Sequence, residues 1–299
     1  MAGAVLITGG RGFVGSYLRR ELGARAVVTR ADVTDAEAVA EAVRDAHPVA
    51  VIHLAAYSSV GASWENPRAA WEVNAIGTVN VLDAVRRHQP ETRTLVVSTG
   101  EVYGNADQIP TSESAPVAPL SPYATAKAAA ELETERARRT VGLDIVIVRP
   151  FPHIGPGQAE RFAVGSWTRQ IARLEHLGGG TLYVGDVSAK RDVTDVRDVV
   201  RAYRLLLDPS VRAGTYNVAS GRCPPMKALL EELLSRARCQ IAVEVDERRL
   251  RHADVPVLCG DHSLLSTATG WRPRIPLERT LTETLEHARR TVREEVTQR

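Results

Sequence analysis

The sequence predicts an α/β protein in which a doubly wound parallel sheet is followed by a smaller mixed α/β lobe. Three observations support this prediction. Short apolar runs alternate with helix-forming stretches up to about residue 150, several of these runs are apolar throughout, and a glycine-rich turn follows the first run. Uniformly apolar strands are typical of a parallel sheet that helices cover on both faces. The 299 residues suffice for one large unit or two closely packed parts.

The elements of the first part follow one another in a regular order. We expect strands at residues 5–8, 26–28, 49–54, 94–98 and 143–148. We expect helices from the glycine turn to about residue 22 and at residues 35–46, 67–88 and 121–140. Pro122 falls in the first turn of the last helix, where proline is best tolerated.

The alternation weakens after about Pro150. Prolines and glycines there separate two or three expected helices from strand-like segments at residues 182–184 and 215–218. We therefore expect a second lobe formed mainly by residues 151–299, with residues 194–218 returning to the first domain.

Composition and charge exclude several classes of partner. The formal net charge of +2 is too small to predict binding to nucleic acid or to a membrane surface. No apolar run reaches the roughly 18 residues that a membrane span requires. Cys223, Cys239 and Cys259 lack the spacing of a metal site, and we expect them to be reduced thiols in a cytoplasmic protein without a bound metal.

The first motif is Gly9-x-x-Gly12-x-x-Gly15, directly after an expected strand and at the start of an expected helix. Glycines in this position allow a tight turn and the close approach of a pyrophosphate. The helix N-terminus offers free N–H groups to the phosphates. The motif predicts that residues 1–150 form a Rossmann-type domain that binds NAD(P).

The residues at the end of the second strand indicate whether the site binds the adenosine ribose of NAD or the 2′-phosphorylated ribose of NADP. A carboxylate there favours NAD, whereas an arginine favours the 2′-phosphate of NADP. This chain has Thr29-Arg30 at that point and Arg11 in the glycine loop, while Asp32 is better placed near the adenine. We therefore favour NADP(H), with NAD(H) as the alternative if Arg30 only faces solvent.

The second motif is Tyr123-Ala-Thr-Ala-Lys127. Residues at positions i and i+4 of a helix lie on one face, one turn apart. A nearby ammonium group favours the phenolate and is expected to lower the pKa of the tyrosine, and the positive nicotinamide ring of the oxidised cofactor is expected to do the same. Tyr123 could then exchange a proton with a substrate hydroxyl or carbonyl group.

A third motif, Ser98-Thr-Gly-Glu-Val-Tyr-Gly104, follows a buried strand at the sheet edge where ligands bind in open α/β folds. Thr99 is expected to hydrogen-bond the reacting oxygen beside Tyr123. Glu101 is either a general base, a carboxylate that shapes the sugar pocket, or a loop acid in contact with water.

These motifs together resemble the nucleotide-sugar branch of the extended short-chain dehydrogenases/reductases. The resemblance rests on the glycine motif, His53-Leu-Ala-Ala56, Val73-Asn74, Thr99 and Tyr123-x-x-x-Lys127. Further segments are similar to GDP-mannose 4,6-dehydratases and, more closely, to GDP-4-keto-6-deoxy-D-mannose reductases. These segments are residues 58–60, 151–158, 191–203, 216–221 and 269–273.

The resemblance implies a role for each matching residue. Tyr123 would protonate the C4 oxygen of a 4-keto sugar while NADPH delivers hydride to C4, and Lys127 would hold the cofactor ribose. The implied cofactor-binding residues are Gly9, Arg11, Gly12, Phe13, Val14, Arg30, Asp32, Val33, Leu54, Ala55, Ala56, Tyr123, Lys127, Pro150 and His153. The implied residues for a GDP-linked sugar are Ser58, Glu101, Arg161, Arg191 and Arg251, the last two at the diphosphate.

The chain also departs from the family pattern. Pro152 stands where family members often have asparagine, and Arg251-His-Ala-Asp254 replaces Arg-Pro-x-Asp. Gly100 has no side chain to protonate a leaving C6 hydroxyl, which favours a reductase over a dehydratase. An epimerase and a non-catalytic NADP-sensing protein are the remaining alternatives. The family also implies a homodimer that pairs through the helices at 67–88 and 121–140.

Overall fold

The structure is a computed structural model that describes residues 3–250 and 255–298. Its centre is a six-stranded sheet in the order β10-β5-β4-β3-β1-β2, with every pair parallel. The strands are β1 (Val5–Thr8), β2 (Ala26–Val28), β3 (Ala50–His53), β4 (Arg93–Val97), β5 (Ile145–Pro150) and β10 (Thr215–Val218). The predicted fold class is confirmed.

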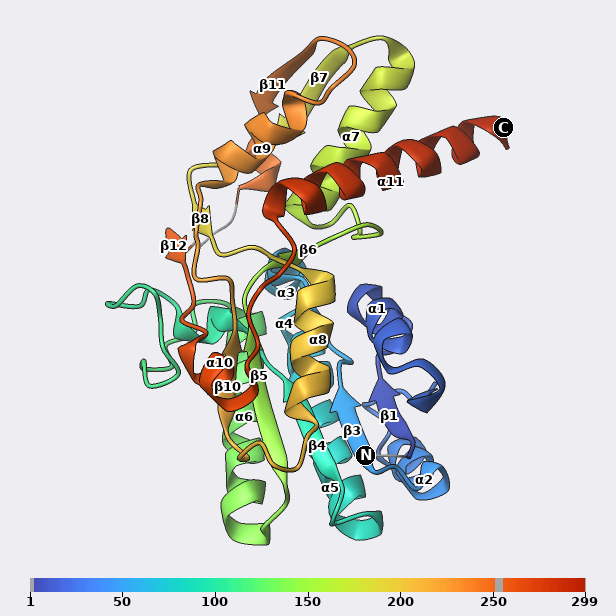
Figure 1. Ribbon diagram of the computed structural model, residues 1–299, viewed down its shortest axis with the longest axis vertical. Helices are drawn as coiled ribbons and strands as arrows, with labels where there is room; N and C mark the ends of the chain where they lie inside the picture. The colour runs from blue at the N-terminus through green and yellow to red at the C-terminus, as the bar shows by residue number, and fades with distance from the viewer. Residues whose placement is uncertain (1–2, 251–254, 299) are drawn as a thin grey trace.

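Alternate residues of the strands face two different hydrophobic cores. Val5 and Ile7 of β1 pack with α1 (Phe13–Leu22) and α8 (Val196–Leu206), which lie against each other. Leu6, between them, packs on the opposite face with α2 and α5. The helices of that face are α2 (Ala36–Ala46), α5 (Gly77–His88) and α6 (Pro122–Arg136). Helices cover both faces of the sheet (Figure 1), which explains why most of its strands are largely apolar.

The two long predicted helices are present, but each contains a π-helical turn. The first consists of α4 (Pro67–Trp71), a π-turn at Glu72–Ile76 and then α5. The second is α6, which Ser121 caps by accepting a hydrogen bond from the Ala124 N–H, followed by a π-turn at Ala137–Val141. The short helix α3 (Val60–Glu65) was not predicted.

The second lobe lies beyond the carboxyl ends of the strands and forms the upper part of Figure 1. It contains a parallel pair, β7 (Gly180–Val184) and β11 (Ile241–Val245), packed with helices. The expectation of two or three helices after residue 150 is wrong, because the described part of the chain contains five. They are α7 (Ala163–Leu177), α8, α9 (Met226–Leu234), α10 (Ser263–Thr269) and α11 (Leu277–Thr297).

Two short strand pairs lie between the lobe and the sheet, while α8 and β10 pack with the sheet itself. The pairs are β6 (His153–Ile154) with β9 (Thr194–Asp195), and β8 (Lys190–Arg191) with β12 (Val257–Leu258). After β9 the chain forms α8, which packs on α1, and then β10, which is the sheet edge beside β5.

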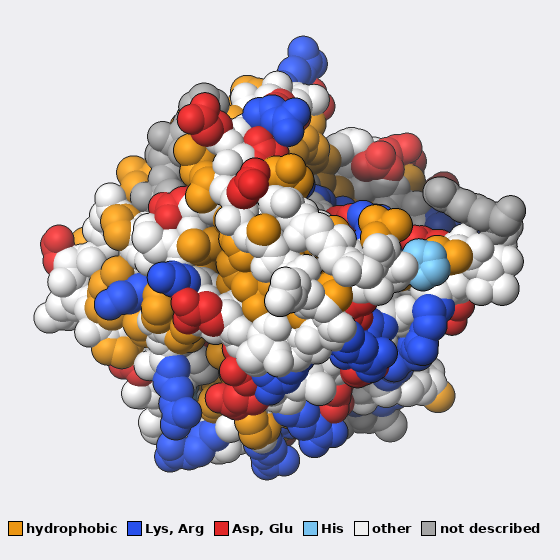
Figure 2. All heavy atoms as spheres, turned by 90° about the horizontal axis from the view of Figure 1, so that it is seen from above, with side chains coloured by type: hydrophobic (Ala, Val, Ile, Leu, Met, Phe, Trp, Pro, Cys, Tyr) orange, Lys and Arg blue, Asp and Glu red, His pale blue; other side chains and the backbone are white. Residues whose placement is uncertain are grey.

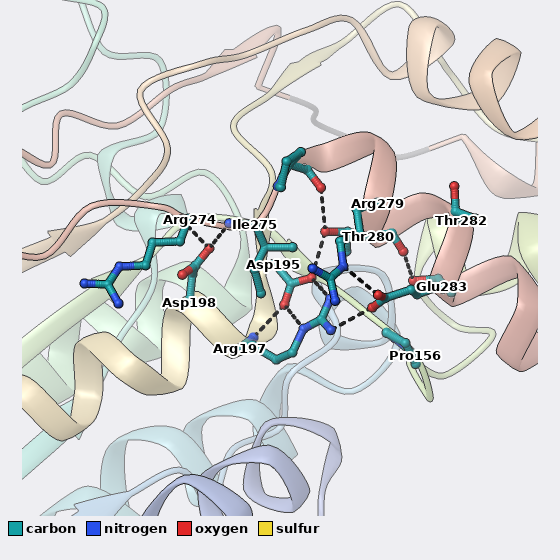
Figure 3. A network of polar contacts seen from close by, with 12 residues as sticks. Pro156, Asp195, Arg197, Asp198, Arg274, Ile275, Arg279, Thr280, Thr282 and Glu283 are labelled. Atoms are coloured by element: carbon teal, nitrogen blue, oxygen red, sulfur yellow. Dashed lines mark hydrogen bonds and ion pairs between the residues drawn. The ribbon is translucent and has the colours of Figure 1, made fainter.

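A network of polar contacts fastens the start of α11 to the start of α8 (Figure 3). The buried carboxylate of Asp195 accepts hydrogen bonds from the Arg197 N–H at 2.8 Å and from the Thr280 hydroxyl at 2.7 Å. Arg197 also pairs with Glu283 at 2.6 Å. Asp198 accepts from the backbone N–H groups of residues 274–275. These contacts place the C-terminal helix on the sheet-bound helix α8.

One face of the molecule carries charges of both signs. Seen from above, basic side chains are interspersed with acidic ones (Figure 2). Among the described residues, no helix is both long and apolar enough to cross a membrane. The same part of the chain holds no group of three or more His, Cys, Asp or Glu side chains that could bind a metal ion.

Candidate active site

One cleft of about 1070 Å³ lies between the carboxyl ends of the sheet strands and the second lobe. It brings together all of the sequence-predicted site residues that the structure describes. They are Gly9, Arg11, Gly12, Phe13, Val14, Arg30, Asp32, Val33, Leu54, Ala55, Ala56, Ser58, Thr99, Glu101, Tyr123, Lys127, Pro150, His153, Arg161 and Arg191. Arg251 lies outside the described residues.

Three glycines of the loop, Gly9, Gly10 and Gly15, leave no room for a side chain. A Cβ atom on Gly9, whose φ is +66°, would lie 2.6 Å from the Ala55 nitrogen, and one on Gly15 would lie 2.5 Å from the Gly10 carbonyl carbon. Gly12 precedes α1 and provides no side-chain cap for its first N–H groups. A helix start with free N–H groups and a closely packed glycine turn fits a dinucleotide pyrophosphate.

The adenosine end of the cleft carries two arginines and one carboxylate. Arg11 and Arg30 are both exposed there. Asp32 is also exposed, and its Oδ1 accepts hydrogen bonds from the N–H and the hydroxyl of Thr34, which lower its pKa. Val33 is buried under the sheet edge. The positive side chains at this end suit a 2′-phosphate.

The segment 54–56 forms one wall of the cleft, and buried polar groups fix the residues on either side of it. The Asn74 side chain accepts a hydrogen bond from the Tyr57 N–H at 2.9 Å and donates one to its carbonyl at 3.2 Å. His53 is 2.7 Å from the Thr8 hydroxyl, and burial lowers its pKa to about 3. His53 is therefore a neutral structural group rather than an acid or base.

Helix α6 supplies the two central side chains. The Tyr123 N–H donates to the Ser63 hydroxyl at 3.1 Å, which ties the start of α6 to α3. One turn later, the Lys127 ammonium donates to the Val97 carbonyl at the end of β4, at 2.7 Å. Both side chains are buried at the cleft floor.

The expected lowering of the Tyr123 pKa is wrong for the groups of the protein itself. Burial raises the pKa of Tyr123 to about 12; the hydrogen bond with Thr99 opposes this rise, and the charge of Glu101 adds to it. Burial also lowers the pKa of Lys127 to about 8, against the pull of Glu131. Burial therefore raises the pKa of Tyr123 by more than the charge of Lys127 was expected to lower it.

The loop after β4 has a fixed shape around Gly100. The Thr99 hydroxyl accepts from the Glu101 N–H at 3.2 Å, which caps a short 3₁₀ turn. A Cβ atom on Gly100 would lie 3.1 Å from three carbon atoms of the Phe151 ring, which is fully buried. Residue 100 therefore has neither a side chain nor free space for one.

The substrate end combines a buried and an exposed arginine. Arg191 is buried and donates from Nη1 to the carbonyl groups of Lys190 and Val255, at 2.9 and 2.7 Å. Arg161 is exposed and lies over the Phe162 ring.

The remaining predicted residues of the cleft lie around the substrate end and the glycine loop. Ser58 is exposed. The ring of His153 stacks on Phe13, which joins the loop after β5 to the glycine loop. Pro152 lines the cleft without a polar side chain, and its carbonyl accepts from the Thr194 N–H.

Sequence reasoning missed several residues of the cleft. Arg248 and Arg249 stand at its second-lobe side, and their place in the same basic run as Arg251 could have indicated them. Tyr203 is buried near Tyr123 and its hydroxyl oxygen has no hydrogen-bond partner in the structure. The other missed residues include Trp64, Gln158, Phe162, Trp167, Asp186 and Met226.

A parallel sheet with this glycine loop and a buried Tyr-x-x-x-Lys pair defines an extended short-chain dehydrogenase/reductase, an NAD(P)-dependent enzyme class. The family model described as GDP-mannose 4,6 dehydratase matches residues 19–284, and the chain belongs to this family.

Characterised relatives and a solved structure support this assignment. The chain is 34% identical to GDP-6-deoxy-D-mannose reductase of Pseudomonas aeruginosa, over 99% of this chain and 100% of the relative. It is 31% identical to GDP-mannose 4,6-dehydratase of Yersinia enterocolitica, over 83% of this chain and 74% of the relative. The solved structure of RMD from Pseudomonas aeruginosa complexed with NADPH superposes with a TM-score of 0.88 at 32% identity, covering 97% of this chain and 100% of that one.

Proposed function

We propose that the protein reduces the C4 ketone of a GDP-linked 4-keto-6-deoxy-hexose with NADPH and so produces a deoxysugar nucleotide. The observation that carries this proposal is the buried Tyr123–Thr99 pair beside a residue 100 that has no side chain. A dehydratase must also protonate the departing C6 hydroxyl, and Gly100 offers no group for that step. The similarity to a reductase over the whole chain supports the same choice.

The protein's part in the reaction is to deliver a proton and to hold the reacting oxygen. When bound, the reduced nicotinamide supplies the hydride that adds to C4. Tyr123 is protonated at neutral pH because its pKa is about 12, and it gives its proton to the C4 oxygen as the ketone becomes an alcohol. Thr99 hydrogen-bonds that oxygen. Lys127 holds the cofactor ribose, and its positive charge stabilises the phenolate that Tyr123 leaves behind.

The proposed cofactor site is the part of the cleft that begins at the glycine loop. Residues 1–150 would bind the dinucleotide together with the returning segment 194–218. Arg11 and Arg30 would bind the 2′-phosphate, which favours NADP(H) over NAD(H), while Asp32 would lie near the adenine. The solved relative with NADPH supports this preference.

The proposed substrate site is formed mainly by residues 151–299. Arg191 and Arg251 would bind the diphosphate of the GDP group, and Arg161 would lie near it, because arginine forks suit phosphate oxygens. Ser58 and Glu101 would contact the sugar. Pro152 cannot provide the polar contact of an asparagine, so the other side chains must hold the sugar at that point.

Absorbance of the reduced cofactor tests the proposed reaction. GDP-, dTDP-, UDP- and CDP-linked 4-keto-6-deoxy sugars would each be mixed with the enzyme and NADPH or NADH. We expect stoichiometric loss of NADPH with the GDP-linked sugar. Tight NADPH binding without oxidation of any substrate would contradict an enzymatic role. Formation of a 4-keto product from GDP-mannose without net cofactor change would instead identify a dehydratase.

We also propose a homodimer that pairs through α4–α5 and α6 and a location in the cytoplasm. The helices lie side by side and expose the apolar side chains of Trp71 (42%), Ile76 (52%) and Leu132 (75%), which pairing of two copies would cover. Light scattering after gel filtration would give the mass, and Leu132→Glu should shift a dimer to a monomer. The three free cysteines fit a reducing compartment.

A further inference from the structure

A third ionisable residue, Glu131, continues the helix face that carries Tyr123 and Lys127. The three residues are four positions apart on α6, so each lies one turn beyond the previous one. Glu131 is 6% exposed and Lys127 is 3% exposed. A carboxylate so deeply buried needs a charged or hydrogen-bonding partner to remain ionised.

That partner is Arg149, which reaches Glu131 from the neighbouring strand β5. Its Nη2 atom lies 2.6 Å from one carboxylate oxygen, and its Nε atom lies 3.0 Å from the other. The remaining Arg149 nitrogen donates to the Tyr103 hydroxyl at 2.9 Å, and Tyr103 donates to Asn217 at 2.7 Å. Arg149 thus holds the carboxylate in one orientation, one helical turn beyond Lys127.

The surroundings of Lys127 contain few other charges. On β4 the ammonium meets the neutral Val97 carbonyl, and on β3 it interacts with His53, which is uncharged because its pKa is about 3. Tyr123 on its own helix is protonated at neutral pH. Beyond Arg149, the Glu113 carboxyl group bonds the Asn217 N–H rather than the lysine. Among the described residues, Glu131 supplies a negative charge that acts on Lys127, and the paired Arg149 guanidinium offsets part of that charge.

We propose that Glu131 is a positioning residue whose buried carboxylate, oriented by Arg149, keeps the Lys127 ammonium charged at the cleft floor. The inference rests on the proposed function, in which Lys127 holds the cofactor ribose. Burial lowers the pKa of Lys127 to about 8, and Glu131 opposes that lowering. Without the negative charge of Glu131, Lys127 loses its proton at a lower pH. Cofactor binding and proton transfer both weaken above that pH.

The ion pair could instead serve only to join α6 to β5, and a pair of variants separates the two roles. Glu131→Gln removes the carboxylate charge but leaves Arg149 buried without its partner, which is costly to stability. Glu131→Gln combined with Arg149→Met removes both charges and restores an electrically balanced core. A purely structural role would be rescued by the double variant, whereas the effect on Lys127 would persist.

The composition of the chain allows a direct measurement of Lys127. The sequence has three lysines, and Lys190 and Lys227 are both exposed. Labelling the lysine side chains with ¹³C at Cε therefore gives three signals, which Lys190→Arg assigns, and NMR titration follows each ammonium group. NADPH binding, read from cofactor fluorescence over the same pH range, provides a second readout. Neither measurement depends on the identity of the sugar substrate.

We expect the titration midpoint of Lys127 to fall by about one pH unit or more in Glu131→Gln, because a nearby opposite charge shifts a pKa by roughly that amount. The midpoint should fall by less in the double variant, which also removes the opposing charge of Arg149. Glu131→Asp should stay close to the wild type. Glu135→Gln, one turn further from Lys127 on the same helix and paired with Arg138 and Arg139, should change nothing. An unchanged Lys127 midpoint in the folded double variant would overturn the proposal. Failure of every 4-keto sugar to oxidise NADPH would contradict the proposed reaction but not this result.

Discussion

Gly100→Ser tests whether the space beside Tyr123 excludes a dehydratase-type side chain. The new Cβ atom would lie 3.1 Å from three carbon atoms of the Phe151 ring, closer than ordinary van der Waals contact. The ring cannot move freely, because it is fully buried and packs against Tyr103 and Gly260. Overpacking of this kind costs about 1–3 kcal/mol, which lowers the melting temperature of a chain of this size by about 2–5 °C.

Calorimetry would measure the melting temperature of Gly100→Ser, with Gly214→Ser as the control because its neighbours lie at ordinary distances. Mass spectrometry would look for loss of water from GDP-mannose, which we expect to be absent. Phe151→Leu combined with Gly100→Ser should recover part of the lost stability, since the two residues share one space. The steric reasoning fails if Gly100→Ser is as stable as the wild type, or if it alone dehydrates GDP-mannose.

Three further predictions concern the proton donor, the cofactor and the α8–α11 network. Tyr123→Phe should slow the reduction by about 10²–10⁴-fold with NADPH binding retained, and equally weak binding and turnover would point to a structural role instead. Arg30→Ala should weaken NADPH binding by roughly tenfold or more and leave NADH binding unchanged, as fluorescence titration would show; equal losses for both would argue against a 2′-phosphate contact. Thr280→Val leaves the buried Asp195 short of a donor and should cost about 1–3 kcal/mol in denaturant unfolding, whereas the control Thr282→Val, which removes an exposed hydroxyl, should cost little.

The sequence was most informative where local pattern and burial agree. Most strands of the sheet are largely apolar because helices cover both faces, so their positions could be predicted to within a residue or two. The glycine turn and the Tyr123–Lys127 pair could be predicted because each is a short motif whose residues have a fixed spacing along the chain. By contrast, α3 has six residues and α10 seven, too few for a clear helical period.

Other features depend on segments that meet only in the folded chain. Tyr203 belongs to a hydrophobic helix face in the sequence, and only the packing of α8 on the sheet brings it near Tyr123. The high pKa of Tyr123 was missed for a similar reason, since the extent of burial is set by the whole fold. The pairing of Glu131 with Arg149 joins a helix to a strand and has no signature in the spacing of either.

The return of residues 194–218 to the sheet has a consequence for how this molecule could be divided. A fragment ending at residue 150 would lack β10 and α8, so β5 would become an open edge and the core around Val199, Val200 and Tyr203 would lose one side. Open apolar strand edges invite association with other chains. A cut or a fusion at residue 150 would therefore divide one hydrophobic core, because residues on both sides of that point pack in it.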